Sequence, residues 1–134
     1  MNYNLLKIFV YGTLKPGERN YQRYCVGKVV EQQRAIANGQ LFALPLGYPA
    51  MTLGDNLVYG FLLTFADQLI LETLDNLEGY EPSRPQSENH YNRSLIEIYT
   101  INERSQCTAY AYLMELKQVN FLNGVFLASG NWNE

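Results

Sequence analysis

The sequence predicts an α+β fold built around a small mixed or closed β-barrel. Six segments have the composition of strands, and most follow one another without an intervening helix, which argues against a doubly wound sheet. Several of these strands are so apolar that both of their faces must be covered, as happens in a closed sheet. The 134 residues fit one domain, 1–134, and 47% of them are hydrophobic, enough for one core.

The N-terminal third is expected to contain two or three strands and one short helix. The first strand, residues 5–10, runs into a glycine loop, residues 11–14, that combines an aromatic ring, a hydroxyl group and a large apolar side chain. Residues 17–25 follow as a short helix. Residues 28–44 form either two strands around an Asn38-Gly39 turn or one strand with a glycine bulge.

The central and C-terminal parts are expected to contain one amphipathic helix and three strands. A continuous apolar run, residues 57–65, predicts a strand buried on both faces. The helix follows, because Asp67 can cap its start and Gly79 can close its end. A polar loop then leads to two segments that alternate like strands, 93–101 and 107–116. The tail beyond them is weakly patterned.

Glu78 is an acidic residue on the apolar face of the predicted helix. That face is defined by three- and four-residue spacing and contains Ile70, Leu71, Leu74 and Leu77. Glu72 and Asp75 are expected on the opposite, solvated side. Glu78 either bends out to water at a frayed helix end or holds its carboxyl group in a partly dry cavity. In the cavity, desolvation and the helix dipole would raise the carboxyl pKa and suit it to acid–base chemistry.

Charge and composition argue against nucleic-acid and membrane partners. The net charge is −3, and the ten Lys and Arg residues are scattered, so no basic face for nucleic acid or for an anionic membrane is predicted. No stretch approaches the roughly 20 apolar residues that span a bilayer. The N-terminus lacks the features of a signal peptide, so a cytoplasmic location is expected.

The cysteine and histidine content predicts no metal site. Cys25 and Cys107 have no CxxC spacing, and His90 is the single histidine, so a Cys/His zinc site cannot be assembled. We expect two free thiols in a reducing compartment. His90 lies in the polar loop and is expected at the surface.

Two motifs, in their order and spacing, resemble the γ-glutamylcyclotransferase-like (AIG2-like) family. They are VYGTLKPGERN, residues 10–20, and LDNLEGYEP, residues 74–82, followed by Tyr91-x-Arg93 and a late Tyr-Leu-Met strand. The resemblance spans about residues 7 to 115. It implies a small mixed β-barrel flanked by helices, a cyclotransferase that needs no metal or cofactor, and a small-molecule γ-glutamyl substrate.

The resemblance also implies the site residues. The catalytic glutamate of the family maps onto Glu78, which would be the general acid/base. The substrate-binding loop maps onto four consecutive residues: Tyr11, Gly12, Thr13 and Leu14. Gly12 is expected to let the chain turn with its N–H groups facing inward, where they can hold a carboxylate or an oxyanion. The implied reaction is attack of the substrate α-amine on its own γ-carbonyl, which releases 5-oxoproline and an amine or amino acid.

Alternatives stay open at this point. The same cavity without turnover would make the chain a binding module for a carboxylated or γ-glutamyl metabolite, and an enzyme of another class or an interaction protein with a decayed site are further possibilities. Pro16 departs from the family pattern and stiffens the loop exit. The long stretch 80–90 is either a lid or a solvated loop, and Arg93 is expected to anchor a strand or to pair with an acid. The leaving group and the oligomeric state are not specified by the sequence.

Overall fold

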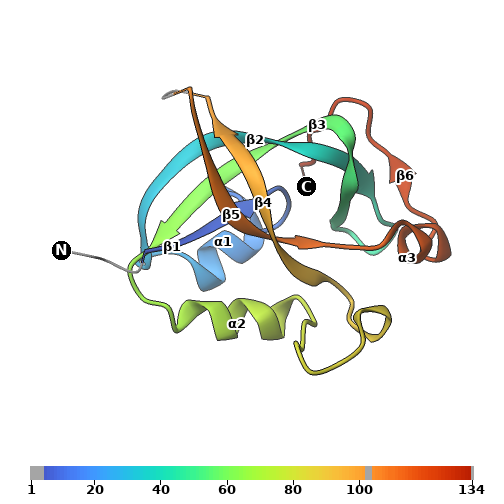
Figure 1. Cartoon of the computed structure of the whole chain (residues 1–134), viewed down its shortest axis with the longest axis horizontal. Coiled ribbons are helices and arrows are strands. Elements are labelled where there is room, and N and C mark those ends of the chain that lie inside the picture. Colours follow the sequence, from blue (N-terminus) through green and yellow to red (C-terminus); the bar gives the residue numbers. More distant parts are fainter. Residues whose placement is uncertain (1–4, 102–103, 134) are drawn as a thin grey trace.

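Five strands close into a mixed β-barrel in the computed structural model, which describes residues 5–101 and 104–133 (Figure 1). The strands are β1 (Leu6–Val10), β2 (Val29–Ala43), β3 (Pro49–Phe65), β4 (Asn92–Thr100) and β5 (Ser105–Leu113). Their order is β3-β1-β5-β4-β2, and the ring closes because β2 also pairs with β3. The β1–β5 pair is parallel and the other pairs of the ring are antiparallel. The predicted α+β barrel is therefore confirmed.

The two longest strands, β2 and β3, form the antiparallel pair that makes up much of the barrel wall. β2 continues through Gly39 with a register shift between Gly39 and Gln40, so the bulge interpretation is right and the two-strand interpretation is wrong. A Cβ atom on Gly39 would lie 2.6 Å from Met51 Cε and 2.7 Å from the Thr52 carbonyl oxygen, which explains the glycine. β3 begins at Pro49, earlier than the predicted strand 57–65.

Helices flank the barrel (Figure 1). They are α1 (Arg19–Tyr24), α2 (Ile70–Leu77), a 3-10 turn η1 (Gln86–Glu88) and α3 (Leu116–Phe121). α3 and the short strand β6 (Val125–Phe126), which extends the sheet beside β2, were not predicted. No helix in the described part of the chain is long and apolar enough to cross a membrane.

Apolar side chains fill both the barrel and the layer between barrel and helices. One cluster consists almost entirely of strand residues, including Phe9 and Leu62, and forms the barrel interior. The other joins Ile8 and Val10 of β1 to Leu74 of α2. Successive residues of a strand point to opposite faces, so β1 is buried on both sides, as its apolar sequence predicts. Because both faces of β1 are packed, the position of the loop that follows this strand is fixed.

Candidate active site

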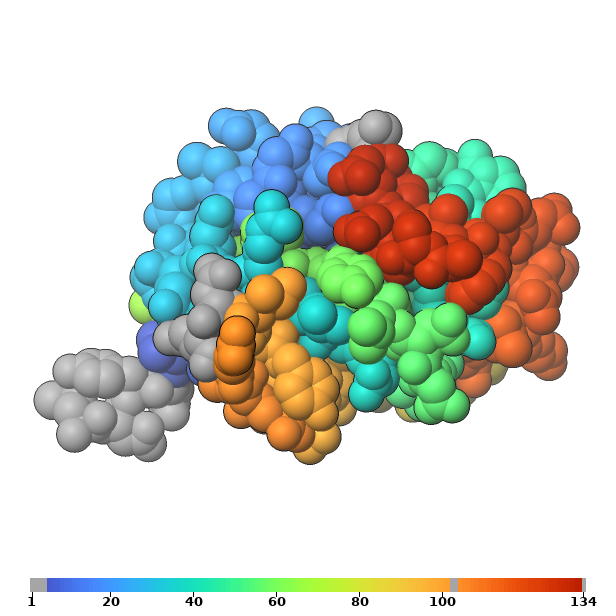
Figure 2. Space-filling view, turned by 90° about the horizontal axis from the view of Figure 1, so that it is seen from above, coloured from blue at the N-terminus to red at the C-terminus, as the bar shows by residue number. Residues whose placement is uncertain are grey.

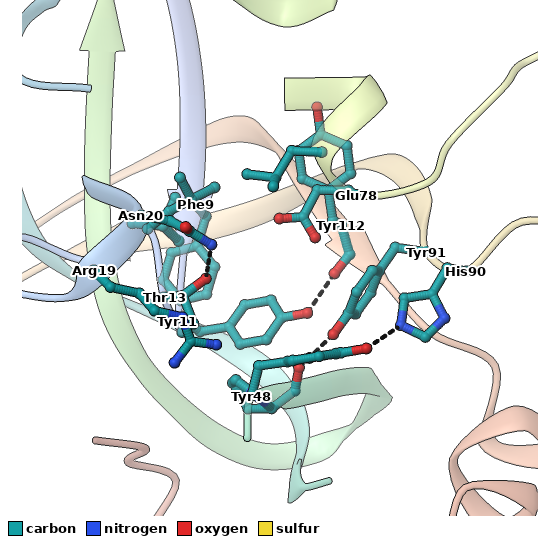
Figure 3. A pocket seen from close by; sticks show the side chains of 15 residues that line it. Phe9, Tyr11, Thr13, Arg19, Asn20, Tyr48, Glu78, His90, Tyr91 and Tyr112 are labelled. Atoms are coloured by element: carbon teal, nitrogen blue, oxygen red, sulfur yellow. Dashed lines mark hydrogen bonds between the residues drawn. The ribbon is translucent and has the colours of Figure 1, made fainter. Parts of the chain in front are cut away.

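A cavity of about 250 Å³ lies where β1 ends, beside the start of α1 and the end of α2 (Figure 3). All four residues of loop 11–14 line it, and so does Glu78. Two motifs more than sixty residues apart in the sequence thus meet at one cavity. Glu78 and loop 11–14, which the family resemblance assigns to one site, therefore share this cavity.

The end of α2 fixes the backbone of Glu78. Gly79 has a left-handed φ of 68°, the N–H of Tyr80 donates to the Asp75 carbonyl at 2.9 Å, and the Gly79 N–H donates to the Asn76 carbonyl at 3.3 Å. These are the two hydrogen bonds of a Schellman motif, which ends the helix and leaves Glu78 at the C-cap. Its carbonyl oxygen in turn accepts the Tyr91 N–H at 3.3 Å.

The Glu78 carboxyl group is half-buried at the cavity and has no partner among the described residues. Burial raises its pKa from 4.5 to about 7, because a charged carboxylate is poorly solvated there. No residue in 5–101 or 104–133 donates a hydrogen bond to the carboxylate or forms an ion pair with it. A carboxyl group in this condition gains or loses a proton near neutral pH.

The rings of three tyrosines, Tyr11, Tyr91 and Tyr112, form rigid walls of the cavity. The Tyr11 hydroxyl donates to the Tyr112 carbonyl at 2.5 Å and accepts the Met51 N–H at 3.3 Å. The Tyr91 hydroxyl donates to the Pro49 carbonyl at 2.6 Å. Burial raises the pKa of each of these phenols far above its usual value. These three phenols therefore stay neutral at pH 7.

The backbone of loop 11–14 runs beside the cavity. Within the described ranges, no acceptor binds the N–H groups of Gly12, Thr13 or Leu14. A Cβ atom on Gly12 would lie 2.6 Å from Cγ and 2.8 Å from Cδ of Pro49. Gly12 does not have a positive φ. The glycine is therefore required by the close approach of the Pro49 ring, a reason that differs from the predicted freedom to turn.

The loop is held on two sides. On one side, Asn20 donates from its amide side chain to Thr13 Oγ1 at 2.8 Å and from its backbone N–H to the Thr13 carbonyl at 2.9 Å. On the other side, the buried Lys15 ammonium donates to the Trp132 carbonyl in the C-terminal tail. Figure 2 shows that tail in red against the N-terminal segment in blue. These contacts fix the backbone on both sides of the loop.

The prediction that His90 lies on the surface is wrong. His90 lines the cavity, and its Nε2 lies 2.9 Å from the Tyr48 hydroxyl. The stretch 80–90 folds on itself around the buried side chain of Asn89, whose Oδ1 accepts from the Glu81 N–H at 3.1 Å and from Arg84 Nε at 2.9 Å. This internal bonding returns His90 to the site. Burial lowers the His90 pKa, so the imidazole is neutral at pH 7.

Asp75 was expected in solvent, and this prediction is also wrong. Its carboxylate accepts from Arg93 at 2.5 Å and from the Tyr112 hydroxyl at 2.7 Å. The Arg93 guanidinium also lies over the Tyr80 and Tyr110 rings, 5.1 and 5.0 Å from their centroids. Strands β4 and β5 cover that side of α2, which a single helix cannot indicate. The expectation that Arg93 pairs with an acid is confirmed.

Other cavity residues were missed. Tyr48 and Pro49 follow Gly47, which has a left-handed φ of 93° in the structure. In the sequence, Gly47 and Pro49 indicate a turn and do not indicate that it reaches a cavity. Arg19 and Asn20 lie at the start of α1, and the sequence predicts for them only a place in a short helix. The described residues contain no group of three or more His, Cys, Asp or Glu side chains that could hold a metal ion.

Comparison with known proteins identifies related chains. The family described as "Gamma-glutamyl cyclotransferase, AIG2-like" matches residues 8–134. A "Gamma-L-glutamyl-butirosin B gamma-glutamyl cyclotransferase" from Niallia circulans is 34% identical over 73 residues, which cover 54% of this chain and 46% of that protein. The chain therefore aligns with less than half of this curated relative.

Solved structures share the fold. YkqA from Bacillus subtilis superposes with a TM-score of 0.67 at 24% identity, over 96% of this chain and 39% of that one. An AIG2-like protein from Mus musculus gives a TM-score of 0.66 at 21% identity, over 82% of this chain and 77% of that one. At these identities the likeness establishes the barrel fold. Together with the match over residues 8–134, it places the chain in the gamma-glutamyl cyclotransferase, AIG2-like family.

Proposed function

We propose that the chain is a γ-glutamyl cyclotransferase that converts a γ-glutamyl compound into 5-oxoproline and a free amine or amino acid, with Glu78 as general acid/base. The observation that supports this most strongly is the Glu78 carboxyl group, which has a pKa of about 7 and no partner in the described residues. It shares its cavity with loop 11–14. The family match and the name of the curated relative support the reaction class.

In this proposal the substrate contacts both loop 11–14 and Glu78. The α-carboxylate of the substrate accepts hydrogen bonds from the N–H groups of loop 11–14, because a concave set of backbone N–H groups favours an anion. The adjacent α-ammonium then faces the Glu78 carboxylate. The tyrosine walls hold the apolar part of the glutamyl chain in a bent conformation, with the amine close to the γ-carbonyl carbon.

The reaction is an intramolecular acyl transfer. Glu78 accepts a proton from the α-ammonium, and the free amine attacks the γ-carbonyl to close a five-membered ring. Loop N–H groups stabilise the oxyanion of the tetrahedral intermediate. As the C–N bond to the leaving group breaks, Glu78 delivers the proton to the leaving nitrogen. Over the whole reaction the ring nitrogen loses two protons and the leaving nitrogen gains two, and Glu78 is the group positioned to carry them.

A panel of γ-glutamyl compounds tests the proposal. The wild-type protein should release 5-oxoproline from at least one of them, and Glu78→Gln should abolish that release while the circular dichroism spectrum stays unchanged. Glu72→Gln is the matched control, because Glu72 lies exposed on the same helix. Full turnover by Glu78→Gln would refute the assigned role. Binding without any 5-oxoproline would favour the alternative function, a binding module for γ-glutamyl metabolites.

A further inference from the structure

The hydroxyl group of Tyr48 has a different kind of partner from the hydroxyl groups of the other cavity tyrosines. Four of the described residues that line the cavity are tyrosines, and the other three donate to backbone carbonyl groups or to the Asp75 carboxylate, which is already paired with Arg93. The Tyr48 hydroxyl instead lies 2.9 Å from His90 Nε2, as the dashed line in Figure 3 marks. A carbonyl oxygen is too weak a base to take up a proton, whereas a neutral imidazole can do so near neutral pH.

Backbone hydrogen bonds hold His90 at a fixed position relative to Glu78. The His90 N–H donates to the Gly79 carbonyl at 3.2 Å, and the N–H of the next residue, Tyr91, donates to the Glu78 carbonyl at 3.3 Å. The His90 ring also packs edge-on against the Tyr91 ring, with their centroids 4.8 Å apart. The residue that carries the carboxyl group and the residue that carries the imidazole are therefore joined through the same end of α2.

The Tyr48 hydroxyl and the Glu78 carboxyl group face the same cavity. Both residues line it, and burial, followed by the negative charge of Glu78, raises the pKa of the Tyr48 phenol. The phenol is therefore neutral at pH 7, and it can give its proton to an acceptor while its oxygen receives another. His90 is half-buried, so its imidazole can exchange protons with water.

The proposed reaction removes two protons from the attacking nitrogen, whereas a carboxylate holds one at a time. Glu78 takes the first proton before the attack. Once the new C–N bond has formed, the ring nitrogen is positively charged and leaves more readily than the unprotonated nitrogen of the leaving group, so the intermediate returns to substrate. Glu78 cannot take the second proton until it has delivered the first. A second acceptor in the cavity would commit the intermediate to products.

We propose that Tyr48 and His90 form a proton relay that takes the second proton from the attacking nitrogen. In the His90 tautomer with its hydrogen on Nδ1, the Tyr48 oxygen accepts the substrate proton while its own hydrogen passes to Nε2. Glu78 delivers the first proton to the leaving nitrogen as the old C–N bond breaks, and the imidazolium releases the second proton to the departing amine or to water. Both groups then regain their starting states. The relay rests on the proposed function, because it adds a second proton-transfer group to that reaction.

Steady-state release of 5-oxoproline by Tyr48→Phe and His90→Ala tests the relay. Each variant should lower kcat by roughly 100-fold, the lower end of what a positioned proton-transfer group contributes, with KM within about twofold of wild type. The double variant should be no slower than the slower single variant, because the two residues act as one unit. Tyr21→Phe is the matched control and should keep the wild-type kcat, since it removes a hydroxyl that meets the Gln32 side chain at 2.7 Å outside the cavity.

Added imidazole separates proton transfer from a purely structural role. Imidazole should raise the kcat of His90→Ala several-fold, and pyrazole, a ring of the same size that is a much weaker base, should not. Equal restoration by both rings, restoration by neither, or independent losses in the double variant would overturn the relay. Tyr48→Phe decides the question if His90→Ala does not fold, because a wild-type kcat in this variant would also overturn it.

The wild-type protein distinguishes failure of the relay from failure of the proposed function. If it releases 5-oxoproline while Tyr48→Phe and His90→Ala keep the wild-type kcat, the relay fails and the cyclotransferase proposal stands. If it releases no 5-oxoproline from any compound of the panel, both proposals fail.

Discussion

Replacing Glu78 by glutamine should stabilise the folded chain above neutral pH. Burial raises the pKa of this carboxyl group from 4.5 to about 7 in the folded state. Between these values the folded state binds a proton that the unfolded state does not, so the free energy of unfolding falls as the pH rises through this window. At about 1.4 kcal/mol per pH unit, the wild-type protein loses roughly 3 kcal/mol by about pH 8. Glutamine does not ionise, so the Glu78→Gln protein does not lose this part of its free energy of unfolding.

Urea unfolding of both proteins at about pH 4.5 and about pH 8 measures the effect. The stability difference between Glu78→Gln and wild type should grow by roughly 3 kcal/mol from the lower to the higher pH, which corresponds to a difference in Tm of about 10 °C. Glu72→Gln serves again as the control, because it removes an exposed carboxylate from the same helix. A difference that is the same at both pH values would show that the Glu78 carboxyl group is solvated, and the reasoning on the site would be wrong.

Three further predictions concern the same site. The kcat/KM for release of 5-oxoproline should rise with pH through about 7, because the base form of Glu78 is required, and a rise centred near its ordinary pKa would contradict this. Gly12→Ala should lower kcat/KM by roughly 100-fold, measured by steady-state kinetics, since the new Cβ atom displaces the loop from Pro49. Asp75→Asn should cost about 2 kcal/mol in urea unfolding, since it removes the acid paired with Arg93; an unchanged midpoint would refute a structural role for this pair.

Local sequence signals predicted the elements that carry the site. The run of apolar residues in β1 requires two covered faces, and both neighbours Ile8 and Phe9 are fully buried. Gly79 predicted the end of α2, and its positive φ is what closes the helix. These predictions succeeded because caps, turns and periodicity are set within a few residues. The Glu78 and loop 11–14 assignments remain predictions, which the geometry supports and kinetics must test.

The parts of the site that depend on distant contacts were not predictable. His90 enters the cavity only because the buried Asn89 folds the stretch 80–90 back on itself. Tyr48 reaches the cavity from a turn between β2 and β3, and its hydroxyl meets His90 there. Neither residue has a neighbour in sequence that indicates burial. α3 was missed for a different reason, since it is a helix of six residues with a single buried side chain, Val119.

Two acids, Asp75 in α2 and Glu78 at the C-cap of this helix, differ in whether their charges are compensated. Asp75 and Glu78 are three residues apart, and neither lies fully in solvent. Asp75 is paired with Arg93 at 2.5 Å and accepts a hydrogen bond from the Tyr112 hydroxyl at 2.7 Å, so its charge is compensated. Glu78 has no such partner among the described residues, and its ionisation weakens the fold. An uncompensated acid that lowers stability is expected to persist where its proton transfer is used, and the cavity beside loop 11–14 supplies a place for that use.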